Sequence, residues 1–222
     1  MDLNIILIIF ALILFVFISL KRLDISLALI IFFLPSYLIR LEIGFIPLTL
    51  LEVMILLTTV IWLVKLITKK QKIYLGGFFL VIAFFILVSL VAVLISPETR
   101  AALGIFKAYF LEAVLFFIVL INVIKSRQGL KLILFSLGAS ALFISLLTFW
   151  QYLGLFPGLE PYISESPARA TSLFEFPTAV GKYLGPVASF FLAFLLVKPF
   201  KEGKNKVFNK IFLWGVVLFS VM

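Results

Sequence analysis

The fold is decided first by residues 3–20, which read LNIILIIFALILFVFISL. Only Asn4 and Ser19 interrupt this apolar run, and about 18–20 helical residues are needed to cross the hydrocarbon core of a bilayer. The run follows Asp2 rather than a basic cluster, and no small-x-small cleavage motif follows it before Lys21, which argues against a cleavable signal peptide. We therefore predict that residues 3–20 form a first transmembrane helix.

The composition of the whole chain agrees with this start. Of its 222 residues, 64% are hydrophobic, 27 are phenylalanine and only 13% are charged, so the chain cannot cover itself with a polar surface and its solvent must be lipid. We attribute the formal net charge of +9 to basic residues in the loops, where such residues set the membrane orientation. We therefore expect no nucleic-acid partner. Because cysteine and histidine are absent, we expect no disulfide, no thiolate or imidazole metal site and no cofactor.

We predict an all-α fold, a polytopic transmembrane helical bundle that forms a single domain over residues 1–222. It has about seven full spans and an incomplete eighth, near residues 3–20, 23–39, 48–66, 74–96, 103–124, 130–153, 177–197 and 211–222, with residues 154–176 as an external loop. Pro35 should kink the second span or end it early. Gly76 and Gly77 should permit close helix packing. Because residues 211–222 are too few to cross a bilayer, we interpret the chain as truncated, the front part of a longer protein.

Basic residues alternate between the loops of this parsing. Most of the 19 Lys and Arg residues follow the first, third, fifth and seventh spans, which places those loops in the cytoplasm. The residues left for the other side are Arg40, Arg100, Lys107, Arg169 and Lys182. The amino terminus and the Arg169 loop are therefore predicted to be non-cytoplasmic.

Four ionisable residues fall inside predicted spans: Glu52, Lys107, Glu112 and Lys182. Intramembrane charges are costly, so they usually face the protein interior and suggest a functional site. On a regular α-helix Lys107 and Glu112 would point in different directions, so we expect Glu112 to pair with Lys182 or Arg169 from another helix. The structural alternatives are an interhelical bond for Glu112 and a lysine that reaches the headgroups for Lys107.

Residues 169–177, RATSLFEFP, form a polar passage between two spans. Residues 157–167, just upstream, contain three prolines and two glutamates and must lie on an aqueous face. An arginine held here, close to the membrane surface, can meet an anionic lipid-linked substrate. The alternative is a loop arginine bonded to nearby carbonyls or lipid phosphates.

Residues 169–178 resemble the RATGxFxNPN signature of the O-antigen ligase family, which also contains O-antigen polymerases and related oligosaccharyltransferases. Ser172 stands where glycine is usual, and Thr178 replaces the asparagine after the proline. Four further segments are similar to family members in order and spacing: residues 35–40, 46–52, 107–112 and 150–154.

The resemblance implies a metal-independent glycosyltransferase of the bacterial inner membrane that serves cell-envelope polysaccharide synthesis, such as lipopolysaccharide. It would move a glycan from an undecaprenyl-diphosphate carrier to a sugar or lipid acceptor on the non-cytoplasmic face. Arg169 would contact the diphosphate, and Glu112 and Glu175 are weaker candidates for a general base. Lys107, Lys182 and Gln151 are candidate substrate contacts. Family members carry a further arginine and a histidine in a later external loop, so these 222 residues are expected to be inactive by themselves.

Two other functions remain open at this point. In a transporter or channel-like protein, Glu52, Lys107, Glu112 and Lys182 would line a path for a solute or ion. Pro35 and Pro186 are possible helix breaks for such a path, but the sequence has no internal repeat. A noncatalytic membrane scaffold is the third possibility.

Overall fold

The computed structural model describes residues 3–43, 46–70, 72–155, 169–197 and 213–217. It divides into two compact units, and the expectation of a single transmembrane domain stays a prediction. Unit 1 comprises Met1–Ile30 and Ser36–Leu132, and unit 2 comprises Ile31–Pro35 and Ile133–Met222. Each unit is described by itself.

The described residues contain five helices long and apolar enough to cross a membrane, over Leu50–Thr68, Gly76–Ile95, Thr99–Val123, Arg127–Tyr152 and Pro177–Leu196. Their most apolar window, in Gly76–Ile95, has a mean hydropathy of 3.3 and is only 11% buried. Leu80, Leu94 and Ile95 are each more than three-quarters exposed, at 76%, 79% and 77%. An apolar surface of this extent needs lipid around it, so the prediction of a helical membrane protein is confirmed at this level.

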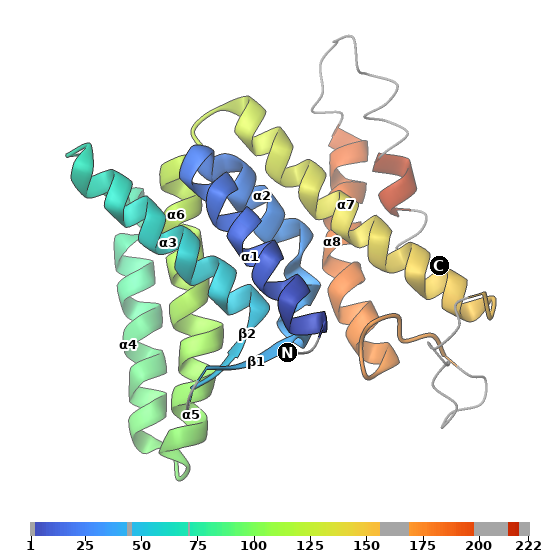
Figure 1. Cartoon of the computed structure of the whole chain (residues 1–222), viewed down its shortest axis with the longest axis horizontal. Coiled ribbons are helices and arrows are strands. Elements are labelled where there is room, and N and C mark those ends of the chain that lie inside the picture. Colours follow the sequence, from blue (N-terminus) through green and yellow to red (C-terminus); the bar gives the residue numbers. More distant parts are fainter. Residues whose placement is uncertain (1–2, 44–45, 71, 156–168, 198–212, 218–222) are drawn as a thin grey trace. The chain divides into compact units, whose positions relative to one another are not determined.

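Unit 1 consists mainly of helices (Figure 1). They are α1 (Leu3–Lys21), α2 (Leu23–Phe32), α3 (Leu50–Thr68), α4 (Phe79–Ile95), α5 (Thr99–Ile105), the π-helical segment η3 (Phe106–Leu111) and α6 (Glu112–Val123). Helix α3 contacts α1 and α6, and α4 contacts α5 and η3. A core of Phe15, Ile30, Met54 and Ile55 joins α1, α2 and α3.

The second predicted span is shorter than its hydropathy indicates. Helix α2 ends at Phe32, and Pro35 lies in the 3-10 turn η1 (Leu34–Leu38), so the prediction of an early end is confirmed. Proline removes a backbone donor and clashes with the preceding turn, which explains this end.

A β-hairpin then precedes α3, between the second and third predicted spans. Strands β1 (Arg40–Ile43) and β2 (Ile46–Thr49) are antiparallel, with Leu41 opposite Leu48. The chain is otherwise mostly helical, consistent with the predicted all-α bundle, and this hairpin is a local exception. Apolar and charged residues alternate along Arg40–Ile43, which is the period of a strand rather than of a turn.

Among the described residues, the paired glycines before α4 make no close contact with another helix. Gly76 lies in the 3-10 turn η2 (Gly76–Phe78) and has φ +55°, a left-handed conformation that glycine adopts without steric cost. A side-chain carbon added at Gly77 would meet no described atom within 4 Å.

Unit 2 contains most of α7 (Arg127–Tyr152), all of α8 (Pro177–Val197) and a helical turn over residues 213–217. Ala141 and Ile144 of α7, and Leu184 and Phe191 of α8, are buried. Three predicted segments lie wholly or mostly outside the described residues: the polar stretch 157–167, the loop after the seventh span and the incomplete eighth span, of which only residues 213–217 are described.

Candidate functional site

The first group of polar residues in unit 1 starts at the amino end of α3. Thr49 and Glu52 form a capping box, in which the Glu52 N–H donates to Thr49 Oγ1 at 3.2 Å and the Thr49 N–H donates to Glu52 Oε2 at 2.9 Å. This exchange satisfies backbone donors that have no partner within the helix. It also fixes the Glu52 carboxylate, which is only 8% exposed as a residue, at the start of the span.

Lys107 reaches the same carboxylate from another helix. Its Nζ lies 3.1 Å from Glu52 Oε2, in an ion pair whose side chains are 31% and 10% exposed. The lysine therefore pairs across α3 and η3, which the sequence could not specify. Reaching the headgroups, the alternative for Lys107, is not needed to accommodate its charge.

The segment that carries Lys107 is π-helical, and this overturns an expectation about Glu112. The Glu112 N–H donates to the Lys107 carbonyl, five residues earlier, instead of the carbonyl four residues earlier. The widened turn places Lys107 and Glu112 on successive turns, so the angular offset predicted for a regular α-helix is wrong here. Isolated π-helical turns are frequent at functional sites.

Glu112 is almost fully enclosed. It is 2% exposed, and its Oε1 atom has no hydrogen-bond partner among the described residues. The charged groups that act on it are Glu52 and Lys107. Its predicted partners, Lys182 and Arg169, belong to unit 2, so that pairing stays a prediction.

In unit 2 the Arg169 loop is held by Gln151 of α7. Gln151 Oε1 accepts the N–H groups of Thr171 and Ser172 at 2.8 and 2.6 Å, and Gln151 Nε2 donates to Thr171 Oγ1 at 3.2 Å. The glutamine is 1% exposed, so it positions the loop and is not accessible to a substrate in this structure. Its role as a substrate contact stays a prediction.

The loop has a specific backbone conformation. Ser172 has φ +53°, in the left-handed region that favours glycine, and its residue is 1% exposed. The Phe174 N–H donates to the Thr171 carbonyl at 3.0 Å and closes the turn. The Phe174 ring packs against Tyr183, whose hydroxyl lies 2.6 Å from Ser140 Oγ. These contacts connect the loop to α7 and α8.

The charged candidates of unit 2 lie at its surface. Arg169, at the start of the described loop, is exposed, as are Glu175 before α8 and Lys182 in the second turn of α8. The structure therefore leaves these side chains accessible and buries Thr171, Ser172 and Phe174 between them.

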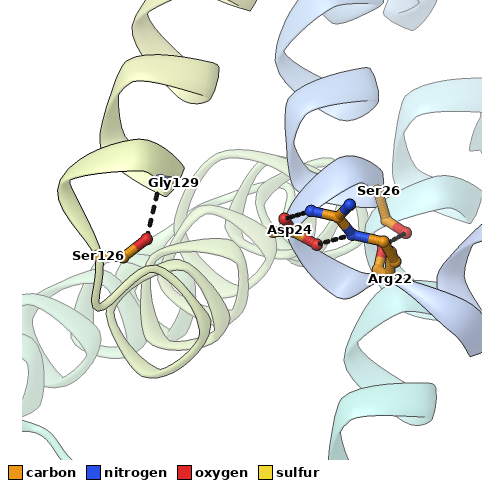
Figure 2. A network of polar contacts seen from close by, with 5 residues as sticks. All are labelled: Arg22, Asp24, Ser26, Ser126 and Gly129. Carbon is orange, nitrogen blue, oxygen red and sulfur yellow. Dashed lines mark hydrogen bonds and ion pairs between the residues drawn. The ribbon is translucent and has the colours of Figure 1, made fainter.

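A third polar group lies where α1 meets α2 and α7 begins (Figure 2). Arg22 donates to both carboxylate oxygens of Asp24, at 3.2 Å from Nε and 2.5 Å from Nη2, and Ser126 Oγ accepts the Gly129 N–H at 3.0 Å. Asp24 lies outside the five candidate spans, and the hydrogen bond from Arg22 lowers its pKa. An open pocket of about 320 Å³ is lined by Lys21, Arg22, Leu23, Asp24, Val123, Ile124, Ser126 and Gly129.

Comparisons of the chain with family models, with curated proteins and with solved structures found no match.

Proposed function

We propose that this chain contributes the Arg169 loop of a membrane glycosyltransferase that moves a glycan from a lipid-diphosphate carrier to a sugar or lipid acceptor. The observation that carries the proposal is the conformation of Ser172. This residue stands where the O-antigen ligase signature has glycine, and its φ of +53° is one that glycine adopts freely. The departure in residue type is thus accompanied by a backbone shape that glycine would favour.

The surroundings of the loop support the same role. Gln151 binds two consecutive backbone N–H groups, and Phe174 is buried against Tyr183, so the loop is held on both sides of Ser172. A transferase needs its charged contacts preorganised, because ordering them during the reaction would cost free energy. Arg169 precedes this braced turn by two residues and is exposed to a ligand.

Arg169 has the chemistry that a diphosphate leaving group requires. Its planar guanidinium can donate two parallel hydrogen bonds to phosphate oxygens, and it remains positively charged as charge develops on the leaving group. Lys182, on α8, is a second exposed cation in unit 2 that can take part in binding the anionic carrier. Glu175 is exposed beside Phe174 and remains the accessible carboxylate of the loop.

The test is glycan transfer, measured per folded molecule of the protein. Arg169→Lys should keep the charge yet lose about ten- to a hundredfold in rate, because a bidentate charged contact contributes about 1.5–3 kcal/mol. Arg169→Ala should lose at least as much. Arg100→Lys and Arg100→Ala are the matched controls, since Arg100 is also an exposed arginine and belongs to unit 1.

Two outcomes separate a site residue from a structural one. A fall in activity per folded molecule for the Arg169 variants alone supports the proposal. Near wild-type specific activity in both Arg169 variants, or an equal loss in the Arg100 variants, removes Arg169 from the reaction.

A further inference from the structure

The carboxyl group of Glu112 is enclosed in unit 1 with one oxygen left without a partner. The residue is 2% exposed, and Oε1 has no hydrogen-bond partner among the described residues. Burying an ionised carboxylate is costly unless it is paired and hydrogen-bonded, and an unpaired one takes up a proton instead. A buried carboxylate oxygen without a hydrogen-bond partner therefore favours the protonated form of the carboxyl group.

The charges around Glu112 do not balance if every carboxylate is ionised. Glu52 from α3 and Lys107 from η3 act on it, so two carboxylates face one ammonium. That ammonium is hydrogen-bonded to Glu52 at 3.1 Å. Of the other elements that contact η3, helix α4 has no titratable residue, and α5 carries Arg100, which is exposed. Tyr109 of η3 is also exposed, at 72%. Among the described residues, the ionisable groups that are not exposed therefore leave one negative charge over unless Glu112 binds a proton.

The backbone also brings Glu112 to this position. The π-helical turn over Phe106–Leu111 places Glu112 one turn after Lys107, through the hydrogen bond from the Glu112 N–H to the Lys107 carbonyl. One turn further along α6, Phe116 packs against the core that contains Met54 and Ile55 of α3. Helix α6 thus meets α3 next to Glu112, in an apolar environment.

We propose that Glu112 is a proton-binding site within the membrane part of unit 1. Its carboxylate takes a proton from water and releases it again, while the Glu52–Lys107 ion pair keeps both of its charges. The exchange consumes no other reactant. Carboxylates within membrane helices are typical of proton relays, and a π-helical turn beside one is consistent with a functional site. The proposal is independent of the transferase function.

The test uses dicyclohexylcarbodiimide, an apolar reagent that adds to protonated carboxyl groups and leaves a stable acylurea. The wild-type protein in detergent is treated at neutral and at alkaline pH, and the adduct is located by mass spectrometry of peptides. We expect the adduct on Glu112 at neutral pH. Its yield should fall as the pH rises, because the ionised carboxylate does not react.

A substitution at Glu52 should change the labelling of Glu112 in a predictable direction. Glu52→Gln removes one of the two carboxylates while the Lys107 ammonium still favours the ionised form of Glu112, so it should lower the labelling of Glu112 several-fold. Glu175→Gln is the matched control, because Glu175 is exposed in unit 2 and its change should leave the labelling of Glu112 unaltered. Higher labelling of Glu112 in the Glu52→Gln variant would contradict the proposal that the Glu52 carboxylate favours protonation of Glu112.

The wild-type measurement decides even if a variant does not fold. An adduct on Glu52 without one on Glu112, or no adduct on either, overturns the proposal. An infrared measurement gives the second readout, a carbonyl stretch of a protonated carboxyl group that Glu112→Gln removes and Glu175→Gln keeps. Absence of that band in the wild-type protein also overturns it.

Discussion

Unit 1 and unit 2 each bury a polar side chain, but they satisfy it in different ways. In unit 2 the neutral amide of Gln151 accepts two backbone N–H groups and donates to Thr171 Oγ1. In unit 1 the carboxyl group of Glu112 leaves Oε1 without a described partner beside the Glu52–Lys107 ion pair. A fully bonded amide stabilises one backbone shape, whereas an incompletely bonded acid can change its protonation state. The two polar groups are therefore suited to different tasks.

The largest loss of stability is expected from a substitution of Gln151, the fully bonded amide of unit 2. Gln151→Met keeps the length of the side chain but leaves the buried N–H groups of Thr171 and Ser172 without their acceptor, at a cost of about 1–3 kcal/mol for each group. Unfolding of the purified protein in detergent measures this loss. Gln128→Met, at an exposed position in the first turn of the same helix, should have no measurable effect. Equal stability of the two variants would show that Gln151 does not hold the loop.

A smaller effect is expected at Ser172. Ser172→Val should lower the free energy of unfolding by about 1–2 kcal/mol, because a β-branched residue is strained at φ +53°. Ser172→Gly relieves the strain and loses only a long hydrogen bond, from Ser172 Oγ to the Ile144 carbonyl at 3.4 Å, so it should remain close to the wild-type protein. The same unfolding measurement ranks the two variants. A Val variant as stable as the Gly variant would argue against the left-handed conformation.

The smallest effect is expected from neutralising Glu112. Glu112→Gln replaces a protonated carboxyl group by an amide of the same shape and should change the stability by less than about 1 kcal/mol, whereas Glu112→Ala removes packed atoms and should cost more. Unfolding of both variants in the same detergent shows which of the two substitutions lowers the stability more. If Glu112→Gln were the more damaging of the two, Glu112 would have to be an ionised partner of a nearby cation.

Local sequence features predicted most of the helix bounds. Hydropathy located the spans of α3, α4, α7 and α8 to within a few residues, because the requirement for an apolar surface about 30 Å long acts on the local sequence. Pro35 indicated the early end of α2 for an equally local reason. The β-hairpin before α3 was missed, although its alternating residues were a usable signal.

The membrane orientation, the glycan and the acceptor are still predictions from charge distribution and from the resemblance at residues 169–178. Glu52, Lys107 and Glu112 could be singled out from the sequence, since any ionisable residue in such an apolar run stands out, and the structure buries Glu52 and Glu112. The partner of Lys107 could not be selected, because pairing depends on which helices meet, and the pairing of Glu112 with Lys182 or Arg169 stays a prediction. Lys107 pairs with Glu52, 55 positions earlier in the chain, and no local pattern specifies that contact.

By itself, then, the sequence determined the class of the protein, most of its helices and the short polar passage around Arg169, because hydrophobicity and helix-breaking residues act over one or two turns. The tertiary structure alone decided three other features: the π-helical turn before Glu112, the left-handed Ser172 and the anchoring of its loop by Gln151. Each of these depends on contacts between segments that are distant in the chain or on a backbone geometry that several sequences could adopt. Hydrogen bonds and packing select among those geometries only once the helices are in place.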